Sequence, residues 1–289
     1  MNKYHTIVIG AGHNGLVTAA YLAKAGKKVL VLERRPVIGG SAASEEIFAG
    51  FKYATCAHLA GAFAPAIVAE LGLQKHGLEI LPLDPLLFAP SLDGNSFLIP
   101  RDPNRAKEEI TRHSSHDAEK FAEFCALTKK LSEFLLTLYS LHLPDRATPG
   151  EFKPMELVKA AWKFHRLGKK EMYEFLRILP MSMADLLGEW FESETLKAAI
   201  ASSSMLGSFV GPRQQGTAYN FLHHRIGAAN GAFRAAGFVR GGMSRIPHAL
   251  SLVAQQHGAE IRTDAEVATV TTKNGATVLA VIWRHTGPV

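Results

Sequence analysis

Cysteine is scarce in this sequence, with two residues, Cys56 and Cys125, that lie far apart and form no Cys-x-x-Cys pair. We therefore expect neither a dithiol redox centre nor a disulfide framework, and the pattern suits a reducing compartment such as the cytoplasm. No window holds about 18 uninterrupted apolar residues, so the sequence predicts no membrane-spanning helix. The adjacent His223 and His224 have no cysteine or carboxylate at ligand spacing, so no metal site is expected.

Long runs of basic residues are also missing. Lysine and arginine number 32 against 26 acidic residues, for a formal charge of +6, but they are scattered along the chain. This argues against a nucleic-acid partner. A mild positive charge suits attraction to a cofactor pyrophosphate or to an acidic lipid surface. Peripheral membrane contact and homo-oligomer formation therefore remain open alternatives.

The first 32 residues have the pattern of a βαβ unit. Residues 4–9 read as a buried parallel strand, residues 14–25 as a helix rich in small residues, and residues 28–32 as a second buried strand. Strand, helix and strand fit into about thirty residues, the usual size of such a unit. The sequence thus predicts an α/β fold with a Rossmann-type parallel sheet.

Further along the chain the hydrophobic period changes twice. Mixed strands and loops are expected up to about residue 101, and a helical period of apolar residues then begins near Asp117, with Pro180 expected to break one helix. A helix and further strands return after the double glycine at 241–242. We predict a discontinuous dinucleotide-binding domain of residues 1–100 and 238–289, and a mainly helical substrate or cap region of residues 101–237.

The turn between the first strand and helix carries a dinucleotide fingerprint. The residues Gly10, Ala11, Gly12, His13, Asn14 and Gly15 satisfy G-x-G-x-x-G between a predicted strand and a predicted helix, which is the context that the motif requires. Gly10 permits the tight turn, Gly12 allows the backbone to approach a pyrophosphate, and Gly15 allows close packing of helix on strand. The helix N-terminus then faces the phosphates with free N–H groups and a favourable dipole.

An acidic residue follows at the end of the second strand. Glu33 lies 18 residues after Gly15, close to the spacing at which a carboxylate binds the hydroxyls of an adenosine ribose. Arg34 and Arg35 come next, but the carboxylate before them would oppose a 2′-phosphate, so a solvated or pyrophosphate-facing pair is the better interpretation. The fingerprint by itself does not separate NAD from FAD.

A second glycine pair, Gly39-Gly40, resembles the loop that large flavoproteins of the amine-oxidase and carotenoid-desaturase superfamily place beside the pyrophosphate; an ordinary surface turn is the alternative. Together with the fingerprint and the segment Ser41-Ala42-Ala43-Ser44-Glu45-Glu46, it is similar to the phytoene-desaturase-related FAD oxidoreductases. The closest branch is the one named for a pyridine nucleotide-disulphide oxidoreductase domain. The resemblance covers nearly the whole chain, including Arg240-Gly241-Gly242-Met243.

This resemblance implies that the chain binds FAD through Gly10, Gly12, Gly15, Glu33, Gly39 and Gly40, with the backbone of Val267 at the adenine. It implies a flavin that accepts a hydride from a C–H bond of a small apolar substrate. The disulphide of the branch name has no thiol pair here, and the family continues beyond residue 289, so a C-terminal truncation is expected. A non-catalytic dinucleotide-binding or interaction protein and a nicotinamide-only dehydrogenase remain as alternatives.

Overall fold

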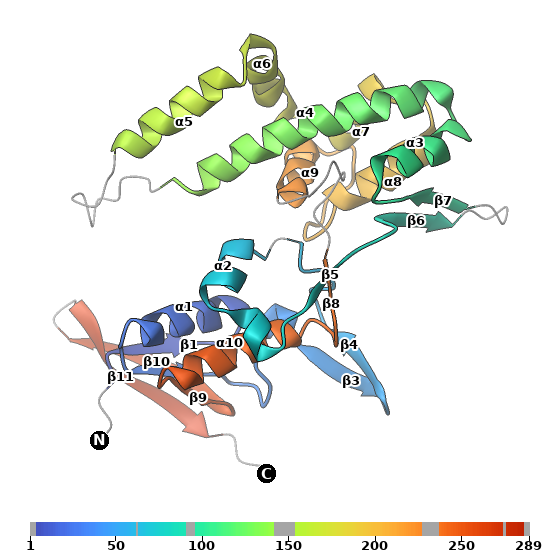
Figure 1. Ribbon diagram of the computed structural model, residues 1–289. Coiled ribbons are helices and arrows are strands. Elements are labelled where there is room, and N and C mark those ends of the chain that lie inside the picture. Colours follow the sequence, from blue (N-terminus) through green and yellow to red (C-terminus); the bar gives the residue numbers. More distant parts are fainter. Residues whose placement is uncertain are drawn as a thin grey trace. The chain divides into compact units, whose positions relative to one another are not determined.

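A computed structural model describes residues 4–61, 63–90, 96–141, 154–226, 237–273 and 276–285. The chain divides into two compact units, of which unit 1 comprises Met1–Pro82 and Gly237–Val289 and unit 2 comprises Leu83–Ala236 (Figure 1). Among the described residues, no helix is both long enough and apolar enough to cross a membrane.

Unit 1 contains the predicted βαβ unit. Strand β1 (Thr6–Ile9) leads through helix α1 (His13–Lys24) to strand β2 (Val29–Leu32), which also pairs with β9 (Glu260–Arg262). Both pairings are parallel, in the order β1-β2-β9. The central strand β2 is buried along its whole length, which explains its continuous apolar sequence. The predicted Rossmann-type sheet is confirmed.

Helix α1 packs beside α10 (Arg245–Gln256) over this sheet (Figure 1). The buried side chains of α1 are Leu16, Ala19, Ala20 and Ala23, at the i, i+3, i+4, i+7 spacing that places them on one face. Three of the four are alanines, so the helix can approach the sheet closely. Burying Leu16 alone contributes roughly 2 kcal/mol.

The remaining elements of unit 1 are short. They are the 3-10 helices η1 (Gly40–Ala42) and η2 (Leu73–His76), helix α2 (Pro65–Glu70), the hairpin β3 (Ser44–Phe48) with β4 (Phe51–Ala54), the pair β5 (Ile80–Pro82) with β8 (Gly237–Val239), and the long pair β10 (Ala265–Lys273) with β11 (Ala276–His285). All three of these pairs are antiparallel.

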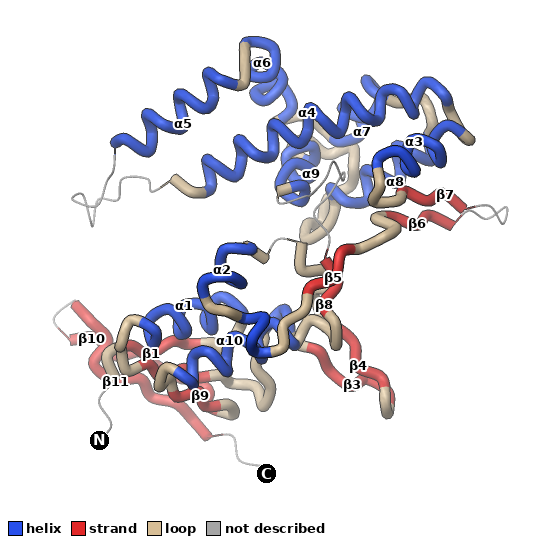
Figure 2. The backbone as a smooth tube through the Cα atoms, viewed as in Figure 1, coloured by secondary structure: helices blue, strands red, loops and turns tan. Residues whose placement is uncertain are grey.

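Unit 2 is helical apart from one hairpin, as the colours of Figure 2 show. Its elements are β6 (Leu87–Pro90), β7 (Ser96–Ile99), α3 (Pro103–Thr111), α4 (Ser115–Tyr139), α5 (Pro154–Arg166), α6 (Lys169–Ile178), α7 (Met183–Trp190), α8 (Glu194–Ala201), η4 (Ser202–Ser204) and α9 (Thr217–Arg225). The apolar side chains of these helices form one core with Phe124 and Phe221 at its centre. Pro180 separates α6 from α7, as predicted, and Ser182 caps α7 through the N–H of Asp185.

The division between the units differs from the predicted boundary at residue 100. The hairpin β6–β7 belongs to unit 2, because Leu87, Phe97 and Ile99 are part of the same hydrophobic core as α3 and α4. The alternating sequence of this hairpin is that of a strand pair, but it does not indicate which helices the apolar face covers. At the second boundary, Gly237 opens β8 and therefore belongs to unit 1.

Candidate functional site: the glycine cradle of unit 1

Each fingerprint glycine has a separate structural task. Gly10 has a φ of +97°, which side-chain-bearing residues rarely adopt, and its N–H donates to the Leu32 carbonyl at 2.7 Å. A Cβ placed on Gly15 would lie 2.2 Å from the Gly10 carbonyl oxygen and 3.2 Å from Val8 Cγ1. These two glycines therefore serve the turn and the close packing of α1 on β1.

Gly12 is different, because neither backbone conformation nor packing requires a glycine there. Its φ of −68° is ordinary, and a Cβ would meet nothing nearer than Gly40 Cα at 3.9 Å. Gly12 is also the N-cap of α1, where it supplies no side-chain hydrogen bond, and the first turn of the helix holds no acidic residue. The first N–H groups of α1 thus form a bare, positively polarised surface, which is suited to an anion.

The second glycine pair lies directly beside this helix end. The N–H of Gly39 donates to the Ala11 carbonyl at 2.8 Å, and Gly39 forms a parallel bridge with Gly12. A Cβ on Gly40 would lie 3.1 Å from Gly12 Cα, and one on Gly39 would lie 3.0 Å from Pro247 Cγ. The loop therefore runs along the glycine turn at backbone contact. We call the two turns together, Gly10–Gly15 with Gly39 and Gly40, the glycine cradle.

Glu33 joins the cradle to the end of β2. Its side chain is 7% exposed; Oε2 accepts the N–H of Ala11 at 2.8 Å, and Oε1 accepts the N–H of Arg35 at 3.0 Å. The carboxylate therefore holds the shape of the turn. A carboxylate oxygen can accept more than one hydrogen bond, so these contacts leave capacity for a ribose hydroxyl. The predicted ribose contact stays a prediction.

The polar residues next to the cradle differ in exposure. Asn14 and Arg34 are exposed, whereas His13 is half-buried at the start of α1. The Arg35 guanidinium pairs with Glu45 on β3, so this charge is already engaged within the protein. The structure thus leaves Arg34 as the more accessible cation of the predicted pair.

Val267 lies on β10, near the same end of β2. The N–H of Ala265 donates to the Glu33 carbonyl at 2.8 Å, which fixes the start of β10 beside the carboxylate. The Val267 side chain is half-buried against Leu30 and Leu32. The structure brings β10 to the predicted neighbourhood, and the adenine contact of the Val267 backbone stays a prediction.

Ala11 is a member of this site that the sequence did not single out. Its N–H contacts Glu33 and its carbonyl contacts Gly39, so one residue connects the first glycine turn to both other parts of the site. Both contacts use the backbone. A side-chain pattern therefore carries no signal for this role, and only its place between Gly10 and Gly12 could have indicated it.

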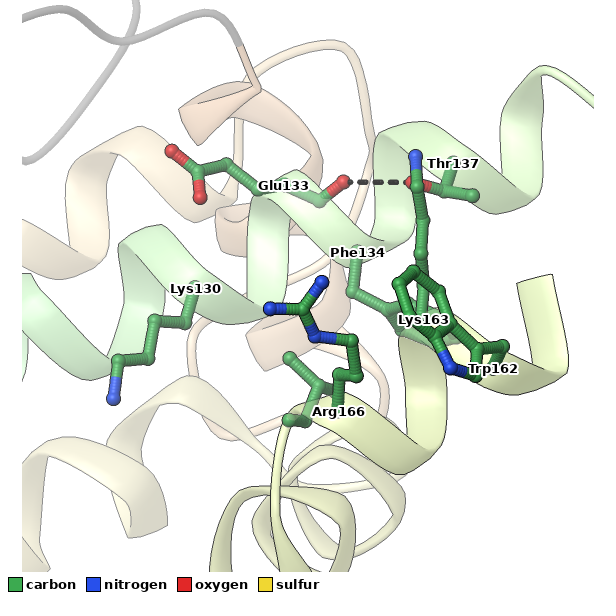
Figure 3. A pocket seen from close by; sticks show the side chains of 8 residues that line it. Lys130, Glu133, Phe134, Thr137, Trp162, Lys163 and Arg166 are labelled. Carbon is green, nitrogen blue, oxygen red and sulfur yellow. Dashed lines mark hydrogen bonds between the residues drawn. The ribbon is translucent and has the colours of Figure 1, made fainter. Parts of the chain in front are cut away.

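A second candidate region lies in unit 2, where α4 and α5 border a cavity of about 440 Å³. Figure 3 shows the lining side chains, which are Lys130, Glu133, Phe134, Thr137, Trp162, Lys163, Arg166 and Leu167. Three cations against one carboxylate around two aromatic rings suit an amphiphilic anion better than a hydrocarbon. The apolar substrate predicted for the helical region therefore finds no specific support in this cavity.

Unit 2 also contains a polar cluster at the end of α4. The Tyr139 hydroxyl lies 2.6 Å from the Tyr219 hydroxyl and 3.0 Å from His223 Nδ1. Burial and the hydrogen bond to Tyr219 raise the pKa of Tyr139. Burial, with a smaller effect of His224, lowers the pKa of His223. At neutral pH the cluster therefore consists of two protonated phenols and a neutral imidazole.

Comparison with known proteins agrees with the geometry of unit 1. Residues 8–71 match a family model described as an NAD(P)-binding Rossmann-like domain. This segment includes the whole glycine cradle and Glu33. A solved oxidoreductase from Methanosarcina mazei shares the fold, with a TM-score of 0.57 and 20% identity over 96% of this chain and 55% of that one.

Three curated relatives align along nearly the whole chain. Pyridine nucleotide-disulfide oxidoreductase domain-containing protein 2 of Rattus norvegicus is 33% identical over 97% of this chain and 50% of its own length. A component of the limonene dehydrogenase of Castellaniella defragrans is 32% identical over 94% and 46%, respectively. A 4,4'-diapophytoene desaturase of a Methylomonas species is 24% identical over 95% and 50%. The chain spans about half the length of these relatives.

The glycine cradle, the Rossmann-type sheet around it and these similarities lead to one assignment. The chain belongs to the family of FAD- and NAD(P)-binding oxidoreductases that includes pyridine nucleotide-disulfide oxidoreductase domain-containing protein 2, with the phytoene desaturases as more distant relatives.

Proposed function

We propose that the glycine cradle binds FAD and that the protein is a FAD-dependent dehydrogenase or desaturase of a small apolar substrate. The observation that carries the proposal is the backbone contact between the two glycine turns. Gly12 and Gly40 approach so closely that a Cβ on Gly40 would lie 3.1 Å from Gly12 Cα. A surface turn has no need for such contact, whereas a backbone wall without side chains suits a long pyrophosphate-linked ligand.

The residues around the cradle have the chemistry that FAD requires. The first-turn N–H groups of α1, including those of His13 and Asn14, would face the pyrophosphate, with exposed Arg34 nearby. Glu33 would accept hydrogen bonds from the adenosine ribose, since its carboxylate is held in place by the N–H groups of Ala11 and Arg35. The backbone of Val267 would contact the adenine.

When bound, FAD supplies the acceptor for a hydride from a substrate C–H bond. The contribution of the chain is to bind and orient the dinucleotide through backbone groups that are fixed before it arrives. The cradle is fixed by the Gly10–Leu32, Gly39–Ala11 and Glu33–Ala11 hydrogen bonds, so little conformational freedom is lost on binding. An apolar substrate is supported by the names of two relatives, which refer to limonene and to diapophytoene.

A site for a nicotinamide dinucleotide alone is the second candidate function. The matching family model is described as NAD(P)-binding, and its segment contains the whole cradle. The Gly39-Gly40 turn favours FAD, because its close approach extends the bare backbone beyond the first glycine turn.

Reconstitution tests both candidates. The 289-residue chain is incubated with FAD or with NAD⁺, desalted, and examined for bound dinucleotide, with folding checked by circular dichroism. We expect retained flavin absorbance, and bleaching of that absorbance when an apolar alkene is added anaerobically. Retention of NAD⁺ without flavin supports the second candidate, and a folded chain that retains neither dinucleotide contradicts the cradle as a cofactor site.

A further inference from the structure

Helices α5 and α6 of unit 2 expose an unusual amount of apolar surface. On α5 the exposed fractions are 61% for Met155, 59% for Val158 and 57% for Trp162, and on α6 they are 66% for Tyr173 and 60% for Leu176. Single exposed apolar residues are normal on protein surfaces, but a group on two consecutive helices marks an interaction surface.

The exposed apolar residues of α5 form a stripe. Met155, Val158 and Trp162 are separated by three and four residues, so they lie on one side of the helix. The opposite side carries Ala160 and Phe164, and the Phe164 ring stacks on Phe134 of α4 with centroids 5.0 Å apart. Helix α5 therefore has two apolar sides, one packed in the protein and one facing outward.

A basic stripe borders the outward side. Lys159, Lys163 and Arg166 repeat the same helical spacing next to the apolar stripe, and the Arg166 guanidinium lies 4.7 Å from the Trp162 ring centroid. Lys169 and Lys170 begin α6, where Tyr173 follows. Within the described ranges, none of these five cations forms an ion pair with a carboxylate.

The cavity between α4 and α5 opens at this basic stripe. Figure 3 shows Trp162, Lys163 and Arg166 of α5 around it, together with Lys130 of α4. Lys163 Nζ donates to Thr137 Oγ1 at 3.3 Å, and Lys130 pairs with Glu171 at 3.1 Å. The cations are thus held at the edge of the apolar stripe, where a phosphate-bearing headgroup would lie.

Lysine content distinguishes the classes of partner. Lysine is depleted at protein–protein interfaces, whereas an apolar stripe beside lysine and arginine is typical of helices that lie in a membrane interface. Tryptophan is enriched at the same depth. The surface formed by Met155, Val158, Trp162, Tyr173 and Leu176, with its five neighbouring cations, has this composition.

We propose that this α5–α6 surface binds the anionic surface of a lipid bilayer. Met155, Val158 and Trp162 enter the headgroup region, and Lys159, Lys163 and Arg166 contact lipid phosphates and carboxylates. The proposal is independent of the cofactor, so it is tested without FAD and stands or falls apart from the proposed function.

The test is co-sedimentation of the 289-residue chain with large vesicles of phosphatidylcholine, with or without phosphatidylserine. We expect binding that requires phosphatidylserine and weakens with salt. Val158→Ser/Trp162→Ser should lower the partition coefficient at least tenfold. Lys159→Gln/Lys170→Gln should lower it roughly tenfold, since each cation near an anionic surface contributes about fivefold. All four side chains are exposed, so the fold should persist.

Two matched controls define the outcome. Phe48→Ser removes an equally exposed aromatic residue from β3, and Lys52→Gln removes an exposed cation from β4. Neither should change vesicle binding. The proposal is overturned if the wild-type chain does not bind phosphatidylserine vesicles, or if the α5 variants bind as the wild type does. It is also overturned if light scattering shows a dimer that Val158→Ser/Trp162→Ser dissociates, because a second copy then covers the surface.

Discussion

Replacing Gly12 with alanine should separate ligand approach from folding within the glycine cradle. The backbone at Gly12 has φ −68° and ψ 167°, which alanine adopts without strain, and the new methyl group would lie 3.9 Å from Gly40 Cα. The free energy of unfolding should therefore change by at most about 1 kcal/mol. The same methyl group would stand among the first N–H groups of α1, where the pyrophosphate is proposed to lie.

The expected loss of affinity follows from those N–H groups. A hydrogen bond to a charged group is worth about 1.5–3 kcal/mol, so displacing the pyrophosphate from one of them should weaken FAD binding roughly 10- to 150-fold. The assay is a fluorescence titration of FAD into the wild-type and variant chains. Gly188→Ala, at an exposed helix position with open space around it, is the control and should bind FAD as the wild type does.

Gly15→Ala and Gly10→Ala should behave in the opposite way. A Cβ on Gly15 would lie 2.2 Å from the Gly10 carbonyl oxygen, which is backbone and cannot move aside, so we expect a stability loss of about 3 kcal/mol or more in urea unfolding. Gly10 has open space but a φ of +97°, and alanine there should cost about 1–3 kcal/mol. An unchanged FAD affinity of Gly12→Ala would refute the placement of the pyrophosphate, and a wild-type stability of Gly15→Ala would refute the packing argument.

Three further predictions concern titratable and polar groups. Glu33→Gln should cost about 1–3 kcal/mol of unfolding free energy in urea, because an amide offers one acceptor oxygen where the N–H groups of Ala11 and Arg35 now use two; Glu46→Gln, at an exposed residue, should change it little, and equal losses would contradict the argument. Burial raises the pKa of the Cys125 thiol to about 11, so Ellman's reagent at about pH 8 should modify Cys56 rapidly and Cys125 only after unfolding; two equally fast thiols would show that Cys125 is not protected. Because burial lowers the pKa of His223 in the folded chain, the unfolded state takes up the proton first, and stability should fall as the pH drops from about 6.5 toward the lowered pKa. Chemical denaturation at several pH values should show a weaker pH dependence for His223→Gln, and an unchanged dependence would assign the effect to other groups.

The vesicle experiment and the Gly12 series address separate parts of the chain. The first depends on α5 and α6 of unit 2, and the second depends on unit 1. A chain that binds FAD but not vesicles, or vesicles but not FAD, would therefore decide each proposal by itself.

The sequence by itself determined the parts of this protein that are local along the chain. The βαβ unit follows from two short apolar runs around a glycine fingerprint, and both strands and the helix lie close to their predicted residues. The tasks of Gly10 and Gly15 were also predictable, because a tight turn and close helix packing act between neighbouring residues. Pro180 and the Ser182 cap marked a helix boundary for the same reason.

Only the tertiary structure decided what depends on residues far apart in the chain. It placed Gly39 against Ala11 and Gly12, turned Glu33 toward the N–H of Ala11, and brought β10 beside the end of β2. It also assigned the β6–β7 hairpin to unit 2 and left one apolar side of α5 uncovered. An apolar pattern records that a side chain can be buried, but the burial itself requires a partner surface, and that surface comes from elsewhere in the fold.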